Sequence, residues 1–136
     1  MLELFGPDRP EDAGYDFYAP RIERSTRMIW SVVLQLAAAR VPSVLEFGLT
    51  TREAREAFYQ QVNAAGLELK LHCLEAPAEL RWQRVEARNQ QRGQTFAITV
   101  TRDMFDFVEQ MWEPPDATEL RAHHGERVDA SRPFSG

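Results

Sequence analysis

The sequence ELKLHCLEAPAELRWQRVEARNQQ, residues 68–91, changes from a strand pattern to a helix pattern at Pro77. Residues 68–74 alternate roughly between apolar and polar side chains, which is typical of a β-strand. Pro77 can occupy the first turn of a helix, and the helical pattern continues to about Gln91. A strand that leads directly into a helix predicts one half of a strand–helix–strand unit.

A second strand is expected upstream of this one. Residues 43–47, with the sequence SVLEF, form a short apolar run before Gly48 that is typical of a buried strand. Thr50 or Thr51 can cap a helix after this run, and Gly66 is expected to end that helix. Two strands that are joined by a helical crossover run parallel. We therefore predict an α/β fold with a parallel sheet and flanking helices.

A long helix is expected near the beginning of the chain. Apolar residues recur at three- and four-residue spacing from about Arg21, and the helix should end before Pro42. Residues 1–20 contain several glycines and prolines, so we expect them to be mostly loop.

The last part of the chain is expected to contain one more helix and a tail. Thr99 or Thr101 can cap this helix, which is rich in apolar residues. We expect residues 1–120 to form one domain and residues 121–136 to form a polar tail. Within the tail, we expect a short strand near Val128, followed by a disordered end.

Composition limits the classes of function. The net charge is −5 and 43% of the residues are apolar, so the chain can form a core but is unsuited to general nucleic-acid binding, which needs a basic surface. Cys73 is the only cysteine, which agrees with a cytoplasmic location. No apolar run is long enough to span a membrane. Lys70 is the only lysine, and such use of arginine suits phosphate recognition or reflects genomic base composition.

Four local patterns follow one another along the chain. They are Leu4-Phe5-Gly6-Pro7 before a helix with Tyr18, Arg21 and Arg24; Val44-Leu45-Glu46-Phe47-Gly48 before Thr51-Arg52 and Arg55; Leu71-His72-Cys73-Leu74-Glu75-Ala76-Pro77 before Arg81, Arg84, Arg88 and Asn89; and Phe96, Val100-Thr101, Phe105-Asp106 and Trp112-Glu113-Pro114-Pro115. Their order and spacing resemble those of an AAA-type family of bacterial P-loop ATP-binding proteins described as predicted kinases. This family is related to zeta-toxin-like kinases and to chloramphenicol phosphotransferase. The resemblance covers residues 4–120 and implies a P-loop NTPase-like fold that binds ATP and Mg²⁺.

The chain departs from this family in two respects. The family begins with a strand and a glycine-rich loop ending in Lys-Ser or Lys-Thr, which holds the nucleotide phosphates. Here the glycines are isolated and Lys70 lies in a strand pattern, so we expect the first strand and this loop to be missing and the sheet to be incomplete. We therefore expect no ATP or Mg²⁺ to bind to this chain alone. The second departure is Glu46, where the family has aspartate near the magnesium ion.

Three arginines form the strongest local signal. Arg81, Arg84 and Arg88 are spaced by three and four residues, so they lie on one stripe of the predicted helix. The resemblance implies that the matching helix is part of a lid, with Arg84 and Arg88 contacting the transferring phosphoryl group and Arg81 binding phosphate beside them. The alternative is pairing of these arginines with glutamates on a surface helix.

Three other residues are candidates for binding. Arg52 and Arg55 follow the carboxyl end of the predicted strand 43–47, where ligands bind in open α/β sheets, so we expect them to contact substrate. The alternative is pairing with neighbouring glutamates. Glu46 lies in an otherwise apolar strand, and a carboxylate there needs a metal, a partner or solvent. Its functional reading is Mg²⁺ binding, directly or through water.

Two hypotheses for function follow. The first is a kinase-like phosphotransferase homologue, inactive in this truncated or decayed form, whose complete relatives transfer a phosphoryl group from ATP to a small-molecule or nucleotide-like acceptor. The second is a non-catalytic remnant that binds a partner or forms a homodimer, which would cover an exposed strand edge. For this chain we predict no thermal shift with ATP.

Overall fold

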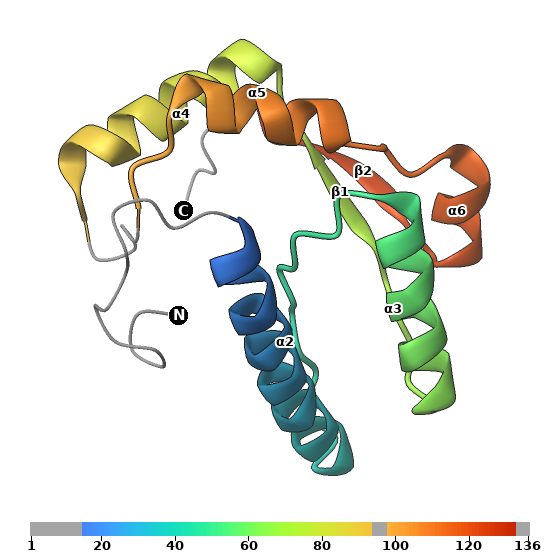
Figure 1. Ribbon diagram of the computed structural model, residues 1–136. Coiled ribbons are helices and arrows are strands. Elements are labelled where there is room, and N and C mark those ends of the chain that lie inside the picture. The colour runs from blue at the N-terminus through green and yellow to red at the C-terminus, as the bar shows by residue number, and fades with distance from the viewer. Residues whose placement is uncertain (1–14, 94–97, 133–136) are drawn as a thin grey trace. The chain divides into compact units, whose positions relative to one another are not determined.

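The computed structural model describes residues 15–93 and 98–132. The chain divides into two units, residues 1–46 and residues 47–136. In chain order the described elements are α2, α3, β1, α4, α5, α6 and β2 (Figure 1). The expected mixture of helices with a parallel sheet is confirmed, and the candidate site lies within the second unit.

The first unit contains one long helix, α2 (Tyr15–Ala38). It begins earlier than expected, because Pro20 is accommodated inside the helix. Proline there removes one backbone hydrogen bond near the helix end rather than in its middle. The helix ends before Pro42, as predicted, and Arg40 takes a positive φ of 59° in the terminal turn.

The sheet consists of two parallel strands in the described part of the chain. Strand β1 (His72–Glu75) pairs with β2 (Glu126–Asp129), and Cys73 lies opposite Arg127 in the register. The strand near Val128 is therefore confirmed. It belongs to the sheet of the second unit rather than to a separate tail.

The predicted strand 43–47 is wrong, because this segment has no regular secondary structure. A strand needs a partner for its backbone groups, and β1 pairs with β2 instead. Val44 is fully exposed, so the apolar run is not buried here. Consequently α3 does not connect the paired strands, and the crossover runs through α4, α5 and α6.

The helix caps agree with the predictions from sequence. Helix α3 (Arg52–Ala64) has Thr51 as its N-cap, and the Thr51 hydroxyl accepts a hydrogen bond from Ala54 N. Gly66 follows with φ of 66°, a conformation that suits glycine because it has no Cβ. Helix α4 (Ala78–Gln91) begins after Pro77, and α5 (Arg102–Met111) has Thr101 as its N-cap.

Helices α4 and α5 lie side by side (Figure 1). The Trp82 and Phe105 rings meet edge to face, with their centroids 5.5 Å apart. Asn89, near the end of α4, also holds Val100, just before α5: its side chain donates to Val100 O at 2.8 Å and accepts from Val100 N at 3.2 Å. These contacts fix α5 against the arginine-bearing helix.

Helix α6 (Ala117–Ala122) was not predicted. It is too short for an apolar period to be visible in the sequence, and it is capped by Asp116, which accepts from the backbone N–H groups of Thr118 and Glu119. Leu120 of this helix joins the small core of the second unit. The other buried side chains there include Tyr59, Val62, Cys73 and Pro115.

None of the helices among the described residues combines the length and the apolar character needed to cross a membrane.

Candidate functional site

An open cleft of about 870 Å³ lies at the carboxyl ends of β1 and β2. Its lining consists of Thr50, Leu74, Glu75, Ala76, Pro77, Arg81, Val108, Glu109, Trp112, Pro114, Arg127, Asp129 and Ser131. These residues come from both strands, from α4 and α5, and from the segments that precede α3, join β1 to α4, follow α5 and follow β2. In open α/β sheets, ligands bind outside the carboxyl ends of the strands, so this cleft is the candidate site.

Two guanidinium groups line the cleft, and each is paired with a carboxylate. Arg81 donates to both carboxylate oxygens of Glu109, at 2.6 Å for the Nη2 contact, and its Nε donates to Ala76 O at 3.0 Å. Arg127 pairs with Glu75 and donates to Pro115 O at 2.6 Å. A bidentate pair of this kind orients the guanidinium plane. An anionic ligand would have to compete with these carboxylates for the two arginines.

The rest of the cleft combines apolar surface with one further acid. Trp112 is 39% exposed and Leu74 is 61% exposed, so both offer apolar surface to a ligand. Asp129 accepts a hydrogen bond from Ser131 N at 2.8 Å. The Ser131 hydroxyl, together with this backbone bond, lowers the pKa of Asp129. The cleft can therefore accommodate a ligand with one planar apolar part and one charged part.

The structure brings two of the three predicted α4 arginines to the cleft. Arg81 lines it, and Arg84 donates from Nη2 to the backbone oxygen of the lining residue Ser131 at 3.3 Å. Arg88 is exposed and does not line the cleft. The alternative of pairing with a glutamate applies to Arg81, but its partner Glu109 lies on α5 rather than on the same helix. The phosphate-binding roles of these arginines stay predictions.

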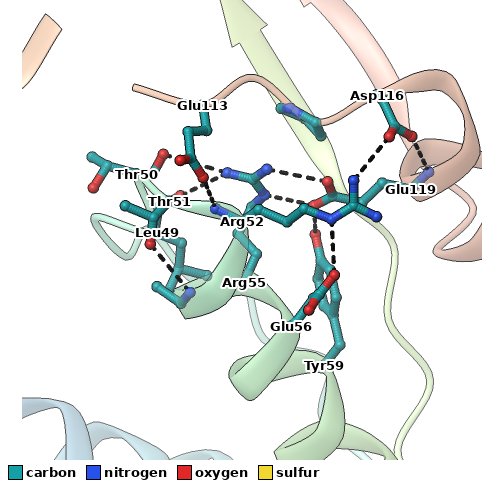
Figure 2. A network of polar contacts seen from close by, with 12 residues as sticks. Leu49, Thr50, Thr51, Arg52, Arg55, Glu56, Tyr59, Glu113, Asp116 and Glu119 are labelled. Atoms are coloured by element: carbon teal, nitrogen blue, oxygen red, sulfur yellow. Dashed lines mark hydrogen bonds and ion pairs between the residues drawn. The ribbon is translucent and has the colours of Figure 1, made fainter. Parts of the chain in front are cut away.

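Arg52 and Arg55 belong to a polar network between α3 and the segment around α6 (Figure 2). Arg52 is exposed and pairs with Glu56 at 2.8 Å and with Asp116 at 3.1 Å. The expected pairing with a neighbouring glutamate thus occurs at Arg52. Neither Arg52 nor Arg55 lines the cleft. Their proposed contact with substrate stays a prediction.

Arg55 is buried, with only 3% of its surface exposed. Its Nε donates to Glu119 Oε1 at 2.5 Å and its Nη2 to Glu119 Oε2 at 3.1 Å. Tyr59 donates its hydroxyl to the same Oε1 at 2.8 Å. The hydrogen bond from Arg55 lowers the pKa of Glu119, and burial raises the pKa of Tyr59. This cluster joins α3 to α6 inside the core.

Glu46, the predicted magnesium ligand, is exposed and is the last residue of the first unit. Among the described residues, His, Cys, Asp and Glu side chains form no group of three or more arranged to hold a metal. The cleft carboxylates of Glu75 and Glu109 are already paired with arginines. The role of Glu46 in Mg²⁺ binding stays a prediction.

The sequence did not predict two residues that line the cleft, Arg127 and Glu109, or the buried partner of Arg55, Glu119. Arg127 lies in a polar segment that was expected to be a tail, and no local pattern links it to Glu75. Glu109 and Glu119 likewise find their partners on distant elements. A single sequence carries no signal for such long-range pairs.

Comparison with protein families found a match to a model described as an AAA domain, which covers residues 2–115. Comparisons with curated proteins and with solved structures gave no significant match.

Proposed function

The chain belongs to the AAA domain family, a P-loop NTPase-like family, and on that premise we propose that it is a kinase-like domain whose cleft binds a nucleotide. The observation that carries this proposal is the position of the cleft at the carboxyl ends of two parallel strands, with Arg81 and Arg127 in its wall. Guanidinium groups suit phosphate because they can donate two parallel hydrogen bonds. Trp112 and Leu74 provide an apolar surface for a base.

In this proposal the arginines of α4 act on the phosphate groups. Arg81 and Arg127 would exchange their carboxylate partners for phosphate oxygens, and Arg84 already reaches the backbone of Ser131 at the cleft. Arg88 lies one turn further along α4, where it could neutralise charge on a phosphoryl group if the helix end moved toward the ligand. Preorganised positive charge of this kind is the main protein contribution to phosphoryl transfer.

The affinity for ATP is expected to be low. The 136 residues contain no glycine-rich loop that ends in Lys-Ser or Lys-Thr, so the backbone N–H groups and the ammonium that usually hold the phosphates are not supplied by them. The cleft carboxylates also compete for the arginines. We expect a dissociation constant in the millimolar range, equivalent to about −4 kcal/mol. Such weak binding agrees with our expectation that ATP produces no thermal shift, and it replaces the stricter expectation from the sequence that this chain alone binds no ATP.

Nuclear magnetic resonance can detect such weak binding. We would titrate the ¹⁵N-labelled chain with Mg·ATP and balance ionic strength with sodium chloride. The expected result is a saturable shift of the Trp112 indole signal and of the amides at the ends of β1 and β2. An Arg127→Gln variant should weaken binding by about tenfold, because a charge-assisted contact is lost.

Arg121→Gln is a matched control, because Arg121 is an exposed arginine of the same unit that does not line the cleft. It should bind Mg·ATP as the unmodified chain does. Shifts that never saturate, or that are equal in the Arg127 and Arg121 variants, would refute binding in the cleft. Micromolar affinity would instead refute the argument that tight binding needs the glycine-rich loop.

A further inference from the structure

Glu113 does not line the cleft, but it joins two parts of the cleft wall. It directly follows Trp112 and precedes Pro114, which are both lining residues. The backbone N–H of Glu113 donates to the backbone oxygen of Thr50 at 2.9 Å. Thr50 lines the cleft and lies just before the start of α3. The Glu113 carboxylate Oε2 accepts from the backbone N–H of Arg52 at 2.6 Å. Figure 2 shows Glu113 beside Thr50 and Arg52.

These two hydrogen bonds form a reciprocal link between segments that are 61 residues apart. Arg52 is the first residue of α3, and the first N–H groups of a helix have no partner within it. A carboxylate is favoured at this position because it meets both a free donor and the positive end of the helix dipole. The helix start thus supplies an attachment point for the segment that carries Trp112.

The structure assigns Glu113 the role of a positioning residue that holds the Trp112–Pro114 wall of the cleft against Thr50. The nearby network makes longer contacts at the same place. Arg55 Nη1 donates to Thr50 O at 3.4 Å, and the Arg55 guanidinium lies 5.8 Å from the centroid of the Trp112 ring, whereas the short hydrogen bonds of Arg55 go to Glu119. Without the Glu113 carboxylate, residue 113 itself would keep only its backbone bond to Thr50 O at the start of α3, while the neighbouring residues keep the contacts of Trp112 with Arg55 and of Pro115 O with Arg127. The backbone bond to Thr50 O would then open more often.

Two measurements test the positioning role of Glu113, and only the second, the affinity for Mg·ATP, rests on the proposed function. The first is amide hydrogen exchange without ligand. In a Glu113→Ala variant the backbone N–H of residue 113 can still donate to Thr50 O. If the carboxylate holds the wall in place, this amide should nevertheless exchange at least about tenfold faster than in the unmodified chain, since opening becomes easier.

Glu53→Ala is the matched control. Glu53 is an exposed carboxylate in the first turn of the same helix, so its removal weakens the same helix end without touching the wall. Exchange at residue 113 should stay unchanged in this variant. The assignment would be overturned if the amide of residue 113 exchanged at the same rate in the Glu113→Ala and unmodified chains. It would also be overturned if Glu53→Ala accelerated exchange at this amide as much as Glu113→Ala does.

The second readout is the affinity for Mg·ATP. Glu113→Ala should raise the dissociation constant by up to about tenfold, because the ligand must then order the wall, whereas Glu53→Ala should not. Glu113→Gln keeps an acceptor oxygen and should restore most of the protection and affinity; a glutamine variant as impaired as the alanine variant would overturn the role of this hydrogen bond. If the unmodified chain does not bind Mg·ATP, the proposed function fails, while the exchange result still decides the role of Glu113.

Discussion

Removal of the Glu119 carboxylate is expected to destabilise the second unit strongly. Both partners of the Arg55–Glu119 pair are almost completely buried, with side-chain exposures of 4% and 5%. Replacing Glu119 with alanine would leave the Arg55 guanidinium without its charged partner and the Tyr59 hydroxyl without an acceptor. Breaking one side of a buried ion pair costs about 3–5 kcal/mol.

The size of this loss is large for a small domain. Typical free energies of unfolding are about 5–15 kcal/mol, so Glu119→Ala could remove a large fraction of the total. The penalty comes mainly from the uncompensated charge rather than from lost attraction, because moving ions from water into the core offsets much of their pairing energy. An apolar replacement of the whole cluster, Arg55→Met with Tyr59→Phe and Glu119→Leu, should therefore recover most of the stability.

Urea unfolding followed by circular dichroism measures these differences, provided that the slope of the transition stays constant. Lys70→Met is the control, since it breaks the exposed Lys70–Glu126 pair, and exposed pairs contribute little. A loss below about 1 kcal/mol for Glu119→Ala would refute the reasoning, since that is the range of exposed pairs. A triple variant no more stable than Glu119→Ala would refute the part assigned to uncompensated charge.

Three further predictions concern acid stability, one close contact and one helix cap. Folding lowers the pKa of Glu119 below 4.5, mainly through the hydrogen bond from Arg55, and that of Asp116 below 3.8, mainly through the backbone N–H of Glu119. The two carboxylates therefore stabilise the folded state above these ordinary pKa values, and this stabilisation is lost as the pH falls through them toward the folded pKa. A urea midpoint that rises on acidification below pH 4.5 would contradict this. Gly125→Ala should cost about 1–3 kcal/mol, because the new Cβ would lie 2.8 Å from Leu120 Cδ2 and 3.0 Å from its backbone, and an unchanged melting temperature would count against it. Thr101→Ala should cost about 1 kcal/mol by removing the bond that caps α5, and unchanged amide exchange in the first turn of α5 would argue against this role.

The local features of the fold could be predicted from the sequence because their signals are local. Thr51 and Thr101 stand directly before amphipathic segments, and both cap the helices that follow. Pro77 marks the change from strand to helix at the place where the structure has it. The strand near Val128 was also predicted correctly, because Val128 is an apolar residue within a polar segment.

The pairing of elements could not be predicted in the same way. Residues 43–47 have the composition of a strand, but a strand forms only where a partner offers its backbone groups, and β1 pairs with β2. In the candidate site, the helical stripe identified Arg81 but gave no indication of Glu109 on another helix. The sequence likewise did not indicate that Arg55 is buried against Glu119, a carboxylate 64 residues away.

The parallel pairing of β1 with β2 has a consequence for how the chain acquires its shape. Three helices among the described residues lie between the two strands in sequence, so β2, the strand that pairs with β1, is made only after those helices have emerged during synthesis. Closing such a long loop costs entropy before any ladder bond forms, which slows folding. Until β2 is made, the exposed Leu74 and the edge of β1 that β2 will cover are available to neighbouring nascent chains. We therefore expect aggregation to begin in this interval, and a chaperone would be most useful then.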